Sequence, residues 1–430
     1  MIMSLAVRTI AVATAVGLVS VGMAGAARAA DPGVSKTEVI IGTTTPLTGP
    51  ASPGYKDVPV AAQAYFDYVN KSGGINGRQI KYIVKDDQYN PAATVTKTNE
   101  LILNDKIFAM YGALGTANHL AVVDEINKQG MPDIFVNTGS SLFDNVKKYP
   151  TTFPYFPSYL VEAKVMAYYI KNTPELASKK RCFMYQEGEF GENAGVGFSA
   201  AGMTDWAAQA SYLPTQITRG FGAQVTKLKA AGCELVVFFG VTSATGVLFR
   251  TMAALSFKPT LMVTSVGSEP TIISGIVGSA AAGKAALNGV YTPSFLTPIT
   301  DLGNPYVSQM KTLADAAGLP WNFYTYYGMN TAYVLSQAIK AAGPNLTRKG
   351  LIKAIQTQGR NFKSAAVVPF VVSAKSHQGL TGYWMGKYDS DGVLVRQGKA
   401  NQVYLAGNSS TGTAKVGTFK QPAPTRKLLP

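Results

Sequence analysis

Short apolar runs that alternate with longer segments of helical period are the feature that most constrains this chain. From residue 38 onward, such segments separate the runs EVIIGTTTPL, QIKYIVKDD, IFAMYGAL and DIFVNTG. In the first of these segments Val58, Ala61, Ala62, Tyr65 and Phe66 recur at the spacing of one buried helix face. Alternation of this kind predicts a parallel sheet that is covered by helices.

The alternation starts again after TTFPYFPSY, with the runs RCFMYQ, AQASYL, ELVVFFG and PTLMVTS. Further helices are predicted over 324–342 and 346–356, and strand-like pieces follow in AVVPFVV, GYWMGKYD and NQVYLA. A chain of 430 residues exceeds the usual size of a single core. We therefore predict an α/β protein with two lobes, each built on its own parallel sheet.

The first 30 residues are typical of a secretion signal. Arg8 precedes an apolar stretch over 10–21, and the small residues AARAA lead to a cleavage site near Ala30. Because no cysteine lies near that site, we expect a free periplasmic protein rather than one held by a lipid anchor.

The formal net charge of +15 would suit an acidic partner such as a nucleic acid, a membrane surface or an anionic small molecule. The lysines and arginines are scattered, however, and form no basic stripe interleaved with aromatic residues. We therefore expect no nucleic-acid partner.

The chain has two cysteines, Cys182 and Cys233, and each begins an apolar run that is predicted to be a strand. If these parallel strands are neighbours, both sulfur atoms lie at the same end of the sheet and can form a disulfide bond. The alternative is a pair of buried thiols, because cysteine is often a core residue.

Enzymatic chemistry has no visible place in the sequence. His119 and His377 are the only imidazoles, and no G-x-S-x-G elbow is present. The segment GSAAAGKA resembles a phosphate-binding loop, but it ends in Ala285 instead of Ser or Thr and follows a helical segment. Asp86 and Asp87 suit a helix cap and a turn better than acid–base chemistry. We expect neither catalysis nor a cofactor or metal.

Small hydroxyl residues follow several of the predicted strands, at 115–116, 138–141, 242–243 and 264–265. Helix capping explains any single one of these pairs. Together, at the ends of two sheets, they indicate a polar ligand held by hydroxyls and backbone amides. Tyr55 and Phe190 lie near these ends and are expected to cover an apolar part of the ligand.

The segment YVNKSGGINGRQIKYIVKDDQYNPAA resembles the periplasmic substrate-binding proteins of branched-chain amino acid ABC transporters, the leucine/isoleucine/valine-binding family. The resemblance continues through IFAMYGALGTANHLAV, EFGEN, FGAQVTKLKAAGCELVVFFG and YDSDG, and covers nearly all of residues 36–405. It implies a type I periplasmic binding fold with two Rossmann-like lobes joined by a three-segment hinge. It also implies a ligand trapped on closure and delivery to a membrane permease.

In domain terms, the resemblance implies a first lobe of residues 31–155 and 290–363 and a second lobe of residues 156–289 and 364–408. The segment 409–430, which is rich in Gly, Ser, Thr and Lys near its start, is expected to be a flexible basic tail. We expect a monomer.

The family holds the ligand carboxylate with a hydroxyl residue and amides after its third strand and with small and hydroxyl residues after its fourth. Gly115 and Thr116 match the first position, and Gly139 and Ser140 match the second. The resemblance therefore predicts that Thr116 and the amides at the start of its helix bind a ligand carboxylate.

The family's acid for the ligand ammonium has no direct match. The stretch after TLMV reads Thr264-Ser265-Val266, and Glu269 follows a few residues later. Either Glu269 reaches back to the amine, or the ligand has none. Phe190 replaces a tyrosine and Thr242 replaces an aromatic residue, which indicates a less polar or larger ligand, such as an aromatic or aliphatic acid.

The predicted function is therefore a solute receptor of an ABC importer, for a branched-chain amino acid or a related amine-free acid. The alternative is a ligand-sensing protein that acts on a signalling partner, because the same fold serves both roles.

Overall fold

The computed structural model describes residues 31–430, and the predicted signal peptide lies outside these residues. Five parallel strands form the first sheet, in the order β2-β1-β3-β4-β5. The strands are β1 (Glu38–Thr45), β2 (Gln79–Asp86), β3 (Ala109–Tyr111), β4 (Asp133–Val136) and β5 (Thr152–Pro154). The parallel sheet that was predicted for this half of the chain is confirmed.

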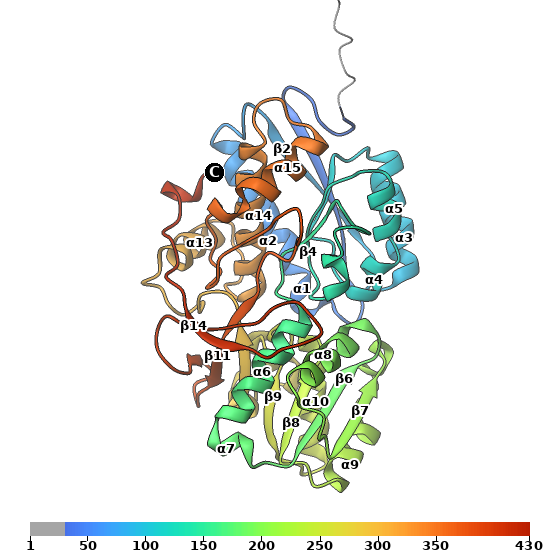
Figure 1. Ribbon diagram of the computed structural model, residues 1–430, viewed down its shortest axis with the longest axis vertical. Helices are drawn as coiled ribbons and strands as arrows, with labels where there is room; N and C mark the ends of the chain where they lie inside the picture. The colour runs from blue at the N-terminus through green and yellow to red at the C-terminus, as the bar shows by residue number, and fades with distance from the viewer. Residues whose placement is uncertain (1–30) are drawn as a thin grey trace, which may run out of the picture. The chain divides into compact units, whose positions relative to one another are not determined.

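Helices cover both faces of the first sheet (Figure 1). They are α1 (Ser52–Tyr55), α2 (Asp57–Lys71), α3 (Pro91–Asn99), α4 (Thr116–Leu120), α5 (Val123–Lys128), α13 (Pro305–Ala316), α14 (Phe323–Ala341) and α15 (Arg348–Gln358). Helix α3 continues into a π-helical turn at Glu100–Asn104, and the segment between β3 and β4 forms two short helices, α4 and α5.

The second sheet has nine strands, in the order β14-β13-β11-β10-β9-β8-β6-β7, with β12 paired to β11. The strands are β6 (Arg181–Gln186), β7 (Ala208–Tyr212), β8 (Leu235–Phe239), β9 (Thr260–Val263), β10 (Tyr291–Ser294), β11 (Gly382–Tyr388), β12 (Leu394–Arg396), β13 (Gln402–Leu405) and β14 (Lys415–Thr418). Strands β6 to β10 are parallel, and β11 to β14 pair antiparallel.

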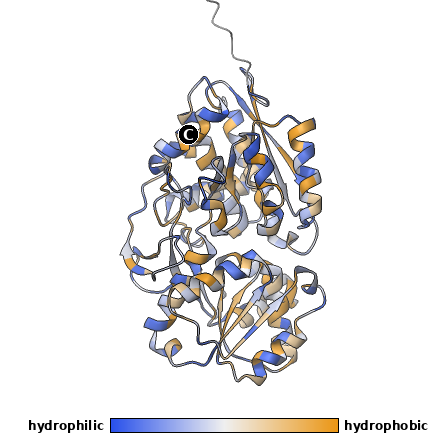
Figure 2. Ribbon diagram, turned by 45° about the vertical axis from the view of Figure 1, so that its right-hand side comes forward, coloured by the Kyte–Doolittle hydropathy of each residue, from blue (hydrophilic) through white to orange (hydrophobic). Residues whose placement is uncertain are grey.

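The helices of the second lobe are α6 (Tyr159–Asn172), α7 (Pro174–Ala177), α8 (Glu189–Ala200), α9 (Gly222–Ala230), α10 (Thr242–Ala254), α11 (Pro270–Val277) and α12 (Ala280–Leu287). Helix α6 packs against α8, and α10 packs against α11. The central strands of this lobe are largely apolar (Figure 2), as in β8, whose five residues LVVFF are all buried.

Each sheet has one point where its strand order reverses. In the first sheet β2 and β3 lie on opposite sides of β1, and in the second β7 and β8 lie on opposite sides of β6. Ligands of open parallel sheets bind beyond the carboxyl ends of the strands at such a point. The helices that follow β1, β3, β6 and β8 carry Tyr55, Thr116, Phe190 and Thr242, respectively.

The chain returns from the second sheet to the first lobe after β10, which is later than the boundary predicted at residue 290. Residues 290–294 were assigned to the first lobe, but β10 pairs with β9 and β11 in the second sheet. The predicted strand AVVPFVV does not form, and Ala366 makes only an isolated bridge to Leu296. This segment instead joins the lobes, since its Phe370 ring packs on Phe135 and Tyr155 of the first lobe.

The segment 409–430, expected to be a flexible tail, contacts both lobes at several points, although most of its residues are exposed. Residues 415–418 form β14, and Gln421 donates to Thr297. The hydroxyl of Tyr65 in α2 donates to the backbone carbonyl of Leu428 at 2.7 Å, and Leu428 is fully buried. Tyrosine hydroxyls of the first lobe donate to backbone carbonyls of this segment. Because backbone groups make these contacts, the side-chain composition of the segment did not reveal them.

The predicted disulfide between Cys182 and Cys233 is confirmed, with the two Cα atoms 5.8 Å apart. It forms because β6 and β8 are adjacent and parallel, and Cys182 pairs with Val236, three residues after Cys233. Among the described residues, no helix combines the length and hydropathy that a membrane span requires.

Candidate functional site

The loop after β3 brings a backbone turn and a hydroxyl to the edge of the first sheet. Gly115 has a φ of +105°, and a Cβ there would lie 2.7 Å from the Asn118 side-chain oxygen, so the turn requires glycine. Thr116 follows as the first residue of α4. Its hydroxyl lies 2.7 Å from the hydroxyl of Thr138, which follows β4.

The loop after β4 completes this arrangement. A Cβ at Gly139 would lie 2.7 Å from the Tyr159 ring, so glycine lets that ring approach the sheet edge. The Thr138 hydroxyl also donates to the Tyr159 hydroxyl at 3.5 Å. We call Thr116, Thr138, Gly139 and Ser140 the hydroxyl cradle.

Hydrogen bonds from the hydroxyl cradle reach the second lobe. Ser140 Oγ donates to Glu189 Oε1 in α8 at 2.9 Å, and the Asn193 carboxamide accepts from the Ser141 N–H at 3.2 Å. Gln186, at the end of β6, donates to the Tyr89 hydroxyl at 3.2 Å. These bonds hold the two sheet edges together.

A second cluster lies where α1 and α14 of the first lobe meet the loop after β9. The hydroxyls of Tyr55 and Thr242 both donate to the backbone carbonyl of Val266, at 3.1 and 3.2 Å. The Tyr324 hydroxyl lies 2.5 Å from that of Thr242, and its ring lies 4.7 Å from the Tyr55 ring.

Aromatic rings lie beside both clusters. Burial raises the pKa of Tyr55, and the neighbouring hydroxyls of Tyr324, Tyr159 and Tyr89 raise it further. The Phe190 ring packs on Tyr159, with the ring centroids 4.6 Å apart. The rings of Tyr159 and Phe190 thus lie at the hydroxyl cradle, and those of Tyr55 and Tyr324 lie at the Val266 carbonyl.

Ser265, which stands where the family's acid was expected, is hydrogen-bonded through its backbone to a buried carboxyl group. Its N–H donates to Glu162 Oε1 at 2.5 Å, and the Thr264 hydroxyl donates to the same oxygen at 2.9 Å. Glu162 comes from the first turn of α6 and is fully buried, and burial raises its pKa to about 7. It fixes the turn that presents the Val266 carbonyl.

Glu269 has one engaged and one free carboxyl oxygen. Its Oε2 accepts from the Ile272 N–H at 2.8 Å and so caps α11. Its Oε1 has no hydrogen-bond partner among residues 31–430, although the side chain is buried, and burial raises its pKa.

The predicted site residues thus fall into two connected groups. Gly115, Thr116, Gly139, Ser140 and Phe190 lie around the hydroxyl cradle, and Tyr55, Thr242, Ser265 and Glu269 lie around the Val266 carbonyl. Sequence reasoning missed Tyr89, Tyr159, Glu162, Gln186 and Tyr324. Gln186 ends an apolar run, which is a signal that could have found it, whereas Glu162 lies within a helix and gave none.

Three comparisons bear on these observations. The profile of the family described as Periplasmic binding protein matches residues 38–393. A Leu/Ile/Val-binding protein homolog of Brucella melitensis is 26% identical over 341 residues, which make up 76% of this chain and 85% of that protein.

Two solved structures share the fold. A fatty acid ABC transporter substrate-binding protein from Thermomonospora curvata has a TM-score of 0.74 at 21% identity, and covers 91% of this chain and 98% of its own. A branched-chain amino acid ABC transporter protein from Thermus thermophilus with bound valine has a TM-score of 0.72 at 19% identity, and covers 87% of this chain and 98% of its own. With two α/β lobes and a profile match over most of its length, this chain belongs to the periplasmic binding protein family.

Proposed function

We propose that this protein is the extracytoplasmic solute receptor of an ABC importer, and that it traps a small carboxylate-bearing ligand between its two lobes. The hydroxyl cradle is the observation that carries the proposal. It joins two hydroxyls, Thr116 and Thr138, to the start of α4, whose first N–H groups have no acceptor within the helix. Donors of this kind suit a carboxylate.

The ligand is proposed to be a branched-chain amino acid or a related amine-free aromatic or aliphatic acid. The relatives support this range, since one is named a Leu/Ile/Val-binding protein homolog, one was solved with valine, and one is named for fatty acid transport. The rings of Tyr55, Tyr159, Phe190 and Tyr324 would enclose the apolar part.

Capture is proposed to be a hinge motion of the two lobes. The hydrogen bonds from Ser140 to Glu189 and from Tyr55 to the Val266 carbonyl support this proposal, because they join the lobes only when the sheet edges meet. The closed protein would then deliver its ligand to a membrane permease, acting as a periplasmic monomer whose predicted signal peptide has been removed near Ala30.

The first test is a thermal-shift screen of refolded, ligand-stripped protein against carboxylate-bearing compounds. Leucine, isoleucine, valine and phenylalanine are compared with 4-methylpentanoate, 3-phenylpropanoate and benzoate. A ligand that binds only the folded protein raises its melting temperature. If no carboxylate-bearing compound stabilises the protein, the proposed ligand class is wrong.

The hydroxyl cradle is tested by Thr116→Val, which keeps the shape and removes the hydroxyl. A hydrogen bond to a charged group contributes about 1.5–3 kcal/mol, so we expect the affinity for the best carboxylate of the screen to fall by about tenfold or more. Thr98→Val is the matched control, because Thr98 is equally buried but lies in α3. Equal affinity of wild type and Thr116→Val, measured by calorimetry, would refute this role.

A further inference from the structure

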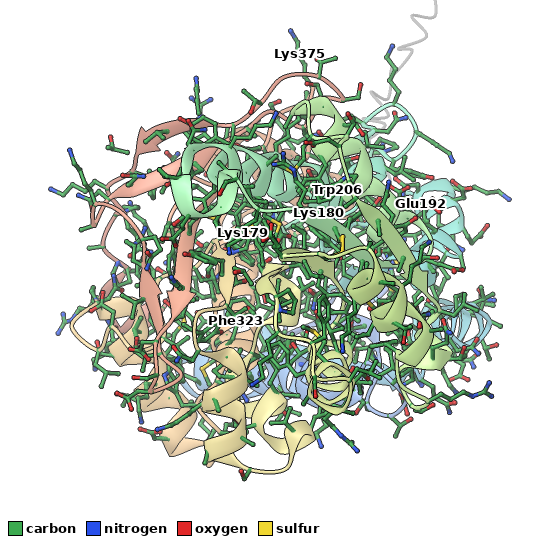
Figure 3. The ribbon with its side chains drawn as sticks, turned by 90° about the horizontal axis from the view of Figure 1, so that it is seen from below. Lys179, Lys180, Glu192, Trp206, Phe323 and Lys375 are labelled. Atoms are coloured by element: carbon green, nitrogen blue, oxygen red, sulfur yellow. A yellow bond between two sulfur atoms is a disulfide. The ribbon has the colours of Figure 1, made fainter. Side chains whose placement is uncertain are left out.

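Within residues 31–430, three crossovers run between the two lobes, over residues 155–158, 295–304 and 362–381. Hinge motions of two-lobed proteins change backbone dihedral angles in a few residues of such connections. The third crossover is exposed at its outer turn, where Lys375 projects from the surface (Figure 3). Groups that bond to the crossovers from outside therefore affect how freely the lobes move. Residues 407–430 bond to all three crossovers, and we call this segment the hinge clasp.

The hinge clasp begins on the second lobe. The ammonium group of Lys164 in α6 donates to three backbone carbonyls, those of Gly407, Ser409 and Thr411, at 3.0, 2.6 and 2.7 Å. Lys164 is only 1% exposed, so it depends on these acceptors in place of water, and they fix the loop to α6. Residues 415–418 then form β14, which pairs antiparallel with β13.

The side chain of Asn408 connects the start of the hinge clasp to the first lobe. Its carboxamide oxygen accepts from the hydroxyl of Ser158, at the end of the first crossover. Its NH2 group donates to Asp144 Oδ2 at 3.0 Å. Because Ser158 caps α6 of the second lobe and Asp144 belongs to the first lobe, this one side chain holds groups of both lobes.

Asp144 links this contact to the hydroxyl cradle. It ends the 3₁₀ turn that begins directly after Ser140 of the cradle. Its carboxylate also accepts from the N–H groups of His377 and Gln378 in the third crossover, at 2.6 and 2.8 Å. The cradle loop, the hinge clasp and the third crossover therefore share one carboxylate, so a displacement of any one of them changes the hydrogen bonds of the others.

The side chain of Gln421 joins the other two crossovers. Its NH2 group lies 3.0 Å from the Thr297 hydroxyl oxygen in the second crossover and 3.1 Å from the Ala366 carbonyl oxygen in the third. Its carboxamide oxygen accepts from the Asn304 NH2 group, also in the second crossover, at 2.9 Å. A relative movement of these two crossovers would break at least one of these hydrogen bonds.

Beyond this side chain, the hinge clasp lies on the first lobe. The hydroxyl of Tyr306 in α13 donates to the Pro422 carbonyl at 2.9 Å, and the fully buried Leu428 accepts from Tyr65. Since β14 belongs to the second sheet and Pro422 is bonded to the first lobe, residues 419–421 alone connect the two attachments. A fully extended chain spans about 3.3–3.6 Å per residue, so a connection of this length allows little separation of the lobes.

We propose that the hinge clasp stabilises the closed arrangement of the two lobes and slows release of the captured ligand, with Asn408 and Gln421 as its positioning residues. This inference rests on the proposed function, because it gives the hinge clasp a part in capture. Opening breaks hydrogen bonds of Asn408 or Gln421 in addition to the direct contacts between the lobes. Removal of either side chain therefore raises the fraction of open protein.

The effect on the lobes is tested without ligand. Nitroxide labels at Lys128→Cys in α5 and Lys227→Cys in α9, both exposed, report the distance between the lobes by double electron–electron resonance. The two native cysteines form the disulfide and do not take the label. In ligand-stripped, full-length protein, Gln421→Met and Asn408→Ala are each expected to raise the ratio of open to closed protein by about threefold to tenfold.

Gln224→Ala is the control for both variants, because Gln224 donates to the Ser211 carbonyl within the second lobe, and its distance distribution is expected to match that of the wild type. Gln421→Met keeps the length of the side chain and removes only its amide. If both clasp variants also match the wild type, the lobes open without resistance from the hinge clasp, and the proposal is overturned.

The effect on the ligand is measured by stopped-flow release of the best compound of the thermal-shift screen. Gln421→Met and Asn408→Ala are expected to release it about threefold to tenfold faster, and Gln224→Ala at the wild-type rate. If the ligand binds but all three variants release it at the wild-type rate, the inference is wrong while the proposed function stands. If the screen yields no ligand, the proposed function is wrong, and the label distances alone decide whether the hinge clasp stabilises the closed arrangement.

Discussion

The two sheet edges use their carboxyl groups differently. At the edge of the first sheet, Asp86 accepts from the N–H groups of Leu47, Thr48 and Gln88, and Asp87 accepts from the Tyr89 N–H and the Thr94 hydroxyl. Every one of these donors belongs to the same lobe, so both acids are committed to local structure.

The carboxyl groups at the edge of the second sheet are not all fully bonded to donors of their own lobe. Glu269 keeps one oxygen free, and Glu189 accepts from Ser140 of the other lobe. Glu162 lies between these extremes, since its donors Thr264, Ser265 and Tyr383 all come from outside its own helix. The number and origin of the donors therefore separate carboxyl groups that hold a loop in shape from those available to a ligand or to closure.

The largest expected effect comes from replacing Asp87, which tests whether the carboxyl groups at the edge of the first sheet stabilise the fold. Asp87→Ala is expected to lower the free energy of unfolding by about 3 kcal/mol, because the Tyr89 N–H and the buried amide of Asn118 lose their acceptor. Urea unfolding measures this loss. Asp67→Ala is the control, because Asp67 is exposed and bonds only to Gln63, and we expect a change below about 0.5 kcal/mol. Equal losses in the two variants would contradict the structural role.

The next effect concerns Glu162 and is a change in how the free energy of unfolding depends on pH. Burial raises its pKa from 4.5 to about 7, so between these values the folded protein binds a proton that the unfolded chain has released. Stability therefore falls as the pH rises through this window, by up to about 3 kcal/mol for this group. Glu162→Gln is expected to lack that part of the loss.

Urea unfolding of wild type and Glu162→Gln at pH 5 and pH 8 measures this difference. Burial also raises the pKa of Asp87, to about 6, and that of Glu269, but these groups are present in both proteins and cancel in the comparison. If the two proteins lose the same stability between the two pH values, Glu162 does not titrate in this window.

The order of the elements followed from the sequence because it depends on local patterns. Apolar runs such as ELVVFFG and helical spacing predicted the parallel sheets, and the start of two neighbouring strands predicted the disulfide of Cys182 and Cys233. The turn role of Asp86 and Asp87 was predicted correctly, since they accept from the N–H groups of Gln88 and Tyr89, but the cap of the next helix is Asn90 and neither aspartate. Each of these inferences needs only residues within one or two elements.

What the sequence did not predict depends on contacts between distant segments. Strand β10 reads YTPS, with a proline and no apolar alternation, and it forms because β9 and β11 flank it. Glu162 lies at the site only because α6 packs beneath the loop after β9. The C-terminal segment is held by side chains such as Tyr65 and Tyr333, which bond to it across the chain.

The smallest expected effect comes from removing the hydrogen bond between Ser140 of the first lobe and Glu189 of the second. Ser140→Ala removes the 2.9 Å hydrogen bond to Glu189, and such a bond to a charged group that is partly exposed contributes about 1 kcal/mol. We expect about fivefold weaker affinity for the best ligand of the screen, through faster release, since the bond exists only when the lobes meet. Ser211→Ala removes a similar 2.8 Å bond to Glu187 within the second lobe and is expected to leave the affinity unchanged. Stopped-flow release rates distinguish the two variants, and equal rates would mean that Glu189, like Asp86 and Asp87, serves only its own lobe.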